Sequence, residues 1–251
     1  MKLSDRLKTA LRKAQSVAVL TGAGVSAESG VPTFRGSEGL WSKFKPEELA
    51  RFDSFIKNPD LVWEWYSYRK KVIREVQPNQ GHLVLARMQE LYPDFTLITQ
   101  NVDNLHTRAG SRNVVELHGN ITRSYCIKCG LQAGEKAQEE FVKAPRCEAC
   151  GGLLRPDVVW FGELLPEGVF EKAMEAAGRA DVFLTVGTSG VVYPAASIPL
   201  AAREAGAYTV EINPEYTDIS PRMHETLIGP SGEILPVLLN TLKENHGHQQ
   251  A

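Results

Sequence analysis

The 251-residue chain has no long apolar run, no block of like charge, no internal repeat and no low-complexity segment. Its longest early apolar stretch, Val17 to Leu20, is far too short for a membrane span or a signal-peptide core. We therefore expect a cytoplasmic protein with no membrane partner. The 28 basic and 30 acidic residues leave a net charge of -2, which argues against stable nucleic-acid binding. We also expect a monomer.

Cysteine is scarce, but its four copies form two CxxC pairs separated by 17 residues. The pairs are Cys126 with Cys129 and Cys147 with Cys150, and this spacing is typical of a four-thiolate zinc site. A redox motif needs only one pair, and structural disulfides are not expected without a secretory signal. Because the segment between the pairs adds no further cysteine or histidine, the pattern favours a closed, structural zinc ion over a catalytic one.

Short β-rich runs alternate with helical stretches along most of the chain. The predicted strands are Val17–Thr21, Phe95–Thr99, Val114–Leu117, Val182–Val186, Tyr208–Ile212 and Thr226–Ile228. The predicted helices are Ser4–Gln15, Leu83–Leu91, Val169–Gly178 and Ala195–Gly206. This alternation predicts an α/β fold with a doubly wound parallel sheet.

Two segments interrupt that pattern and predict a second, smaller domain. Residues 121–154 carry the cysteines and are expected to form an inserted zinc-ribbon module, and residues 37–79 are expected to form a helical insert. The nucleotide-binding domain is then discontinuous, made of residues 1–36, 80–120 and 155–245.

A glycine-rich turn, Gly22-Ala23-Gly24-Val25-Ser26-Ala27, leaves the first predicted strand. Such a turn brings backbone N–H groups close to a dinucleotide pyrophosphate. A hydride-transfer enzyme would also carry an acidic residue about 20 positions later, where this chain has the loop 32–36. The turn therefore fits dinucleotide binding, while the loop 32–36 that follows it does not fit an ordinary dehydrogenase.

Polar residues also follow other predicted strands, at the edge where doubly wound sheets bind ligands. They form the groups Gln100-Asn101-Val102-Asp103, Gly187-Thr188-Ser189 and Asn213-Pro214-Glu215. Among the six histidines, His82 suits a capping or packing role and His106 a structural one. His118 lies beside Gly119 just past a strand, where its imidazole could act as a base or could be structural.

Several strings in family order make the chain similar to the sirtuins, from about Leu11 to Leu239. They are the segment from Gly22 to Gly36, Gln100-Asn-Val-Asp103, His118-Gly119, the two CxxC pairs, Val159-Trp-Phe-Gly-Glu163 and Gly187-Thr-Ser189. The resemblance implies a Rossmann-like fold, one structural zinc ion, and NAD consumed as a co-substrate. It implies an NAD-dependent protein-lysine deacylase.

The resemblance also implies site residues. The nicotinamide half of NAD would contact Ala23, Phe34, Arg35, Asn101 and Asp103, and the adenosine half Gly187, Thr188, Ser189, Asn213, Glu215 and Ser231. Further NAD contacts would come from Gly22, Gly24, Ser26 and Gln100. The acyl carbonyl oxygen would attack the anomeric carbon of the ribose as nicotinamide leaves. His118 would then act as base, with Asn101 and Asp103 fixing the amide and a water, and O-acyl-ADP-ribose would be released.

In the same frame, an acyl-lysine peptide would add as a strand between 159–163 and 190–193. Substrate contacts would come from Ala50, Tyr66, Arg69, Val159, Phe161, Gly162 and Glu163. Tyr66 and Arg69 stand at i and i+3 of a predicted helix, so they share a face and could clamp a carboxylate. This pair resembles the sirtuin branch that removes succinyl and malonyl groups.

Other interpretations stay open at this point. Arg69 could belong to a solvated basic face with Lys70, Lys71 and Arg74, and Tyr68 could replace Tyr66 on the inner face. The enzyme could be a plain deacetylase or a mono-ADP-ribosyltransferase on the same fold. More distant classes are a zinc-containing NAD dehydrogenase and a non-catalytic zinc-ribbon adaptor.

Overall fold

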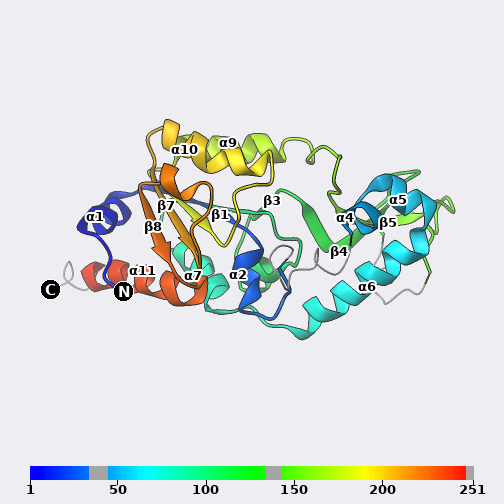
Figure 1. Ribbon diagram of the computed structural model, residues 1–251, viewed down its shortest axis with the longest axis horizontal. Coiled ribbons are helices and arrows are strands. Elements are labelled where there is room, and N and C mark those ends of the chain that lie inside the picture. Colours follow the sequence, from blue (N-terminus) through cyan, green and yellow to red (C-terminus); the bar gives the residue numbers. More distant parts are fainter. Residues whose placement is uncertain (34–44, 134–142, 247–251) are drawn as a thin grey trace.

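The computed structural model describes residues 1–33, 45–133 and 143–246. The predicted NAD contacts Phe34 and Arg35 lie outside these residues. The molecule is elongated, with a parallel sheet and its helices in one half and the helices α4 to α6 with a small two-stranded sheet in the other (Figure 1).

The large sheet is entirely parallel, with strand order β3-β2-β1-β6-β7-β8. Its strands are β1 (Ser16–Thr21), β2 (Asp94–Thr99), β3 (Val115–Glu116), β6 (Val182–Val186), β7 (Tyr208–Asn213) and β8 (Glu225–Ile228). The chain winds outward from β1 to β3 and then returns beside β1 to wind the other way. The switch point therefore lies between β1 and β6, where open α/β sheets bind their ligands.

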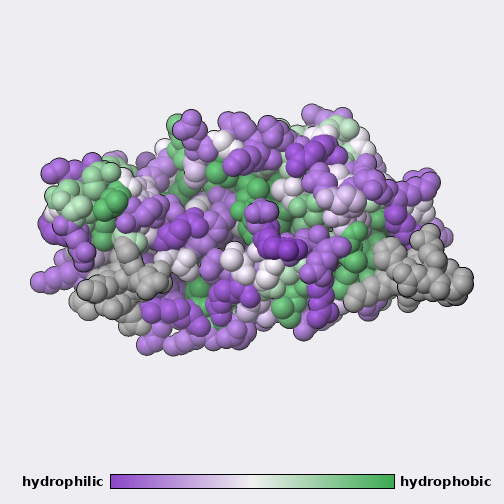
Figure 2. All heavy atoms as spheres, turned by 180° about the vertical axis from the view of Figure 1, so that it is seen from behind, coloured by the Kyte–Doolittle hydropathy of each residue, from purple (hydrophilic) through white to green (hydrophobic). Residues whose placement is uncertain are grey.

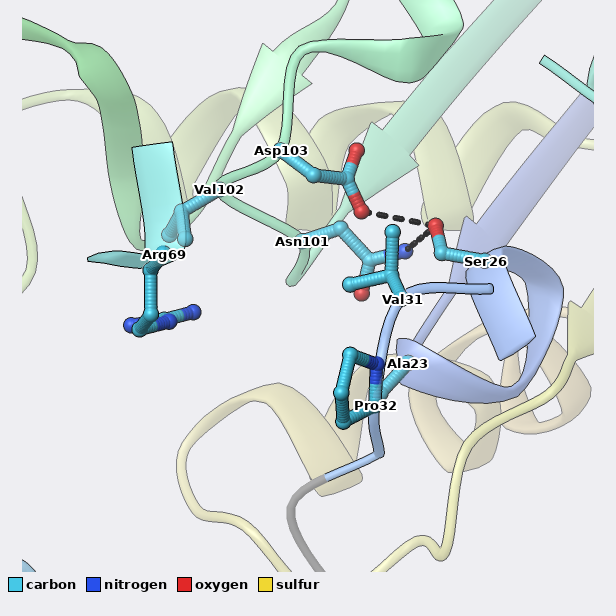
Figure 3. A pocket seen from close by; sticks show the side chains of 8 residues that line it. All are labelled: Ala23, Ser26, Val31, Pro32, Arg69, Asn101, Val102 and Asp103. Atoms are coloured by element: carbon cyan, nitrogen blue, oxygen red, sulfur yellow. Dashed lines mark hydrogen bonds between the residues drawn. The ribbon is translucent and has the colours of Figure 1, made fainter. Parts of the chain in front are cut away.

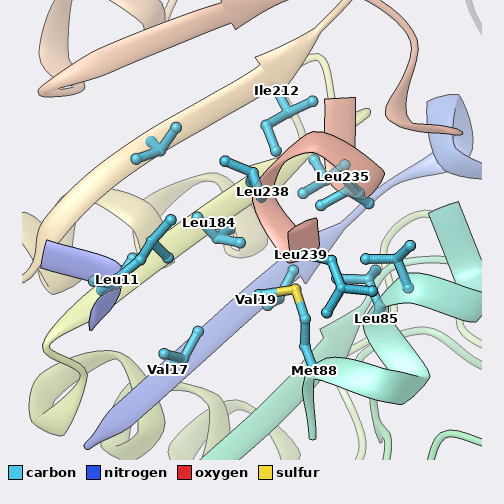
Figure 4. Packing of buried hydrophobic residues seen from close by; sticks show 14 of the residues in the cluster. Leu11, Val17, Val19, Leu85, Met88, Leu184, Ile212, Leu235, Leu238 and Leu239 are labelled. Atoms are coloured by element: carbon cyan, nitrogen blue, oxygen red, sulfur yellow. The ribbon is translucent and has the colours of Figure 1, made fainter. Parts of the chain in front are cut away.

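Helices cover both faces of this sheet, because side chains along each strand alternate between two layers. Val17 and Val19 of β1 join the core on one face, and Ala18 and Leu20 join the core on the other. The first face is covered by α1 (Asp5–Lys13), α7 (Gln80–Met88) and α11 (Ser231–His246), and Figure 4 shows their apolar side chains packed on β1 and β6. The second is covered by α9 (Val169–Arg179), the 3-10 turn η2 (Ala195–Ser197) and α10 (Ile198–Glu204).

The second half of the molecule has its own core. Strands β4 (Gly119–Cys126) and β5 (Leu154–Val158) pair antiparallel. The helices α4 (Pro46–Leu49), α5 (Phe52–Lys57) and α6 (Pro59–Glu75) confirm that the described part of the 37–79 segment is helical. The core unites Phe55 and Trp63 of these helices with Ile121, Cys126 and Trp160. The domain boundaries proposed from the sequence stay a prediction.

Shorter elements complete the chain, namely α2 (Ala23–Ala27), α8 (Leu105–Arg108) and the 3-10 turn η3 (Ser220–Arg222). At the N-terminus the helix begins one residue after Ser4, whose hydroxyl oxygen caps it by accepting a hydrogen bond from the Leu7 N–H at 3.0 Å. Within the described ranges, none of the helices combines the length and apolar character that crossing a bilayer requires. Seen from behind, the surface is mostly hydrophilic, with hydrophobic side chains showing near the middle (Figure 2).

The packing of α11 on the sheet generates a stability prediction. Leu235 is fully buried in the core of Figure 4, so Leu235→Ala should leave a cavity and lower the free energy of unfolding by about 3 kcal/mol. Denaturant unfolding measures this change. Leu164→Ala is the matched control, because Leu164 is 92% exposed and its truncation should change stability by less than about 0.5 kcal/mol. Equal effects of the two substitutions would contradict the packing described here.

Candidate active site

The turns after β1 and β6 meet at the switch point with no space between them. The Gly24 N–H donates to the Gly187 carbonyl at 2.8 Å, and the Gly22 N–H donates to the Val186 carbonyl at 3.0 Å. A Cβ on Gly24 would lie 2.8 Å from Gly187 Cα. Glycine is therefore required at positions 24 and 187 by this close backbone approach. The N–H groups of Gly24 and Gly187 already have partners within the protein, the Gly187 and Ile212 carbonyls.

The polar loop after β2 is bound to the same turn. Asn101 Nδ2 donates to the Gly22 carbonyl at 2.9 Å and to Ser26 Oγ at 3.2 Å. The Ser26 hydroxyl in turn donates to Asp103 Oδ2 at 2.7 Å, as the dashed lines in Figure 3 show. The side chains that the sequence placed in one site are thus brought together from segments more than 70 residues apart.

Ser26 is the centre of this network. His82 Nδ1 accepts a hydrogen bond from the Asn79 N–H, so the neutral ring carries its proton on Nε2, which lies 3.3 Å from Ser26 Oγ. The Ser26 oxygen therefore accepts from His82 and Asn101 and donates to Asp103, which uses its full hydrogen-bonding capacity. His82 has the capping role expected from the sequence, but its contact with Ser26 was missed because no spacing rule predicts it.

A pocket lies beside the polar loop after β2, lined by residues of that loop, of the segment after β1 and of α6 (Figure 3). Arg69 of α6 lies on its far side, across from Asp103. Burial raises the pKa of Asp103, whereas the Ser26 hydroxyl and the Leu105 N–H favour its charged form. The pocket is lined by Ala23, Ser26, Val31, Pro32, Arg69, Asn101, Val102 and Asp103.

His118 is tied to the same loop by its backbone. Its Nδ1 lies 3.0 Å from the Gln100 carbonyl oxygen, which can only accept, so Nδ1 carries the proton and Nε2 keeps a lone pair. Burial lowers the pKa of His118, while the bond to Gln100 opposes that shift. The ring is therefore neutral at pH 7, with one nitrogen available as a proton acceptor.

The residues predicted to contact the adenosine half of NAD lie along the carboxyl edge of β6 and β7 and at the start of α11. Thr188 Oγ1 accepts from Gln100 Nε2 at 2.9 Å, and Asn213 Nδ2 donates to the Thr188 carbonyl at 3.4 Å. Ser189 and Glu215 are exposed at this edge. Ser231 instead donates to Glu28 Oε1 at 2.8 Å, a contact that the sequence did not suggest.

Of the residues predicted to contact substrate, Tyr66 and Arg69 both face the interior. They are 2% and 9% exposed, whereas Tyr68 is 56% exposed, so Tyr66 and not Tyr68 lies on the inner face of α6. The Arg69 guanidinium lies 5.5 Å from the centre of the Tyr66 ring, and burial lowers its pKa. It is therefore not part of a solvated basic face.

The segment 159–163 runs beside these side chains. The Phe161 N–H donates to the Ala50 carbonyl at 2.9 Å, and the Val159 N–H donates to the His118 carbonyl at 3.0 Å. Phe161 is 46% exposed, and Gly162 is also exposed. The Glu163 carboxylate has a structural partner, because it accepts from both terminal nitrogens of Arg155 at 2.5 and 2.9 Å.

The four cysteines form one cluster whose sulfur atoms all lie within 4.8 Å of one another. Sγ pairs lie 3.4 Å apart for Cys126–Cys150 and Cys129–Cys150, and 3.8 Å apart for Cys129–Cys147. Tetrahedral thiolates at about 2.3 Å from zinc are separated by about 3.8 Å, so the cluster fits this metal. All four ligands come from the protein, as in a structural site.

A parallel sheet with paired glycine turns at its switch point, joined to a zinc module, defines the class of Rossmann-like nucleotide-binding proteins. A family model described as the Sir2 family matches residues 22–194, and the chain belongs to this family.

Individual relatives agree with that assignment. The chain is 56% identical over 205 residues to the "NAD-dependent protein deacylase" of Aquifex aeolicus, covering 82% of this chain and 86% of that protein. It is 52% identical to the "NAD-dependent protein deacylase 2" of Pyrobaculum aerophilum, over 96% of both. A mutant Sir2 homologue in complex with ADP-ribose superposes with a TM-score of 0.94 at 42% identity, covering 98% of each chain. A complex of Sir2 with p53 peptide and NAD+ superposes with a TM-score of 0.85 at 32% sequence identity, covering 96% of this chain and 98% of that one.

The cysteine cluster predicts one zinc ion per chain. Cys129→Ser should lose that zinc and lower the melting temperature, because metal binding stabilises the module. Elemental analysis of the purified protein together with thermal unfolding measures both effects. Glu148→Ala is the control, since Glu148 is exposed between two ligands and should leave the zinc in place. The assignment would be contradicted if the parent protein contained no zinc and Cys129→Ser had the same melting temperature as the parent.

The burial of His82 predicts a pH-dependent stability. Burial lowers its pKa from 6.5 to about 4 in the folded protein, so the unfolded chain binds more protons between these values. The stabilisation is complete above pH 6.5 and is lost as the pH falls through 4, by up to about 3 kcal/mol. The free energy of unfolding, measured from pH 7 to 4, should fall less steeply in the His82→Asn variant than in the parent protein. The same substitution at the exposed His224 is the matched control, and equal slopes in His82→Asn and the parent would contradict the prediction.

Proposed function

We propose that this protein is an NAD-dependent protein-lysine deacylase that releases nicotinamide and O-acyl-ADP-ribose. The observation that carries the proposal is a set of hydrogen bonds at the switch point of the sheet. Asn101 and Asp103 are bound to the turn after β1, and His118 is bound to the loop that carries them. The relatives named as NAD-dependent protein deacylases support the proposal, over 82% and 96% of this chain.

NAD supplies an anomeric carbon from which nicotinamide can leave. Asn101 and Asp103, oriented by Ser26, are proposed to hold the nicotinamide amide and a water beside that carbon. His118 Nε2 is proposed to accept a proton from a ribose hydroxyl, and its lone pair faces away from the Gln100 carbonyl that fixes the ring. Phe34 and Arg35, with Ala23, complete the proposed nicotinamide site.

The edge formed by Gly187, Thr188 and Ser189 is proposed to bind the adenosine half, together with Asn213, Glu215 and Ser231. The bond between Gln100 and Thr188 supports this assignment, because it joins the two halves of the proposed dinucleotide site.

The acyl-lysine peptide is proposed to add as a strand between residues 159–163 and 190–193. Both segments expose large apolar side chains, which supports a peptide-binding role: Phe161 is 46% exposed, Val191 39% and Tyr193 72%. A solved complex of the related Sir2 with a p53 peptide and NAD+ supports a peptide as the substrate.

The acyl group is proposed to be acidic, with succinyl and malonyl preferred over acetyl. A guanidinium in a pocket favours an anionic ligand, and the buried Tyr66 stands beside it on the same helix face. Ala50, whose carbonyl binds the Phe161 N–H, is a small residue at this end of the site. Glu163 is proposed to act through the backbone of its segment, since its carboxylate is bound to Arg155.

Mono-ADP-ribosyl transfer would use the same residues and remains the second candidate. A zinc dehydrogenase is disfavoured, because the four cysteines are the one cluster in the described ranges that could hold a metal, and they form a closed site. A monomeric state and a cytoplasmic location stay proposals.

One experiment tests both levels of the proposal. NAD-dependent turnover is measured on one peptide carrying either succinyl-lysine or acetyl-lysine. Arg69→Met should lower kcat/KM for succinyl at least tenfold and change acetyl turnover little, because it removes a charge-assisted contact that only the acidic acyl group makes. His118→Tyr should lower both activities by about 100-fold or more.

The outcomes separate the candidates. Equal loss of both activities in Arg69→Met would show that the carboxylate clamp is wrong and leave a plain deacetylase. A parent protein that binds NAD but deacylates neither peptide would favour ADP-ribosyl transfer.

A further inference from the structure

A hydrogen bond joins the proposed peptide segment to the proposed acyl site. The Trp160 indole Nε1–H donates to the Tyr66 phenol oxygen at 2.9 Å. Both side chains are 2% exposed, and their ring centres lie 6.4 Å apart. In such a dry environment a hydrogen bond constrains the orientation of both groups.

Trp160 is itself held from three directions. The Arg155 guanidinium lies 3.6 Å above the Trp160 ring, and Arg155 is only 4% exposed. Glu163 accepts from Arg155 and also from the Trp160 backbone N–H, the latter at 2.8 Å. Phe55 packs on the indole with ring centres 5.2 Å apart. The direction of the indole N–H is therefore set by the fold.

This contact determines what Tyr66 can offer a ligand. An indole N–H is a donor only, so the Tyr66 oxygen is the acceptor in this bond. Arg69, the cation beside Tyr66, is likewise a donor only. Tyr66 has no acceptor for its own O–H among the residues that the structure describes. Burial raises the pKa of Tyr66, which keeps that proton in place at neutral pH.

We propose that Trp160 is a specificity-determining positioning residue that makes Tyr66 a hydrogen-bond donor towards the acyl group. With its acceptor side occupied by the indole, the phenol recognises acyl chains that end in an acceptor, above all a carboxylate, and gains nothing from a methyl group. This inference rests on the proposed deacylase function and extends the clamp of Tyr66 and Arg69 to a residue in the peptide segment.

The test is a double-mutant cycle on succinyl-lysine and acetyl-lysine peptides, with kcat and KM measured separately. Trp160→Phe keeps an aromatic ring beneath Arg155 and removes the N–H. We expect KM for succinyl-lysine to rise about tenfold, with kcat little changed and acetyl turnover within twofold of the parent. In a Tyr66→Phe background, Trp160→Phe should have no further effect on succinyl-lysine, because the group it orients is gone.

Two further proteins separate this role from general packing. Trp63→Phe removes another buried indole hydrogen bond in the same core, from Nε1 to the Leu154 carbonyl at 2.8 Å, and should leave the succinyl-to-acetyl ratio unchanged. Benzothienylalanine at position 160 replaces the N–H by sulfur at nearly constant shape, and it serves if the phenylalanine variant folds poorly. It should reproduce the loss of succinyl binding.

The results that would overturn the role of Trp160 differ from those that would overturn the proposed acyl preference. If the parent prefers succinyl-lysine and Arg69→Met removes that preference, but Trp160→Phe weakens both substrates equally, the role of Trp160 is wrong and the clamp stands. An equal effect of Trp160→Phe with and without the Tyr66 hydroxyl would also overturn it. A parent with no preference between the two peptides would overturn the acyl assignment and the role of Trp160 together.

Discussion

The close approach of two backbone turns is the constraint on which the site depends. Gly24 and Gly187 meet where β1 and β6 end, with a hydrogen bond of 2.8 Å and no room for a side chain. This contact sets the switch point of the sheet, and the polar loop after β2 is attached to it through Asn101 and the Gly22 carbonyl. His118 is attached to that loop through the Gln100 carbonyl. The geometry of the site is thus built outward from the turns.

Polar groups buried at the end of apolar strands require satisfied partners, and the site supplies them in chains. Ser26 links Asp103 to His82 and Asn101. A second chain runs from His106 through the hydroxyls of Thr21 and Thr99 to the Asn101 N–H. In a low-dielectric interior such chains orient their members strongly, because a buried group that turned away would lose its hydrogen bonds with no water to replace them.

The parts that sequence could predict are those with local patterns. Alternating apolar runs predicted the six strands of the parallel sheet to within a residue or two, but not the antiparallel pair β4 and β5. The spacing of the cysteines predicted a cluster that the fold confirms. Sequence could not predict the bonds from His82 to Ser26 or from Trp160 to Tyr66, which join segments 56 and 94 residues apart. Such contacts depend on how distant segments pack in three dimensions, and neither periodicity nor spacing in the sequence predicts that. The sequence likewise did not predict the ion pair between Glu163 and Arg155, which the structure shows.

Two side chains at the centre of the site are held by main-chain carbonyls: Asn101 by Gly22 and His118 by Gln100. A substitution changes a side chain but leaves the main-chain carbonyl in place. The two accepting carbonyls are therefore retained when the sequence of the loops changes, provided that the loop backbone keeps its conformation. The acyl end is different, since Tyr66 depends on the indole of Trp160. In a diverging lineage the core of the site would therefore be inherited with the fold, while substrate preference could change through a few paired substitutions at its margin.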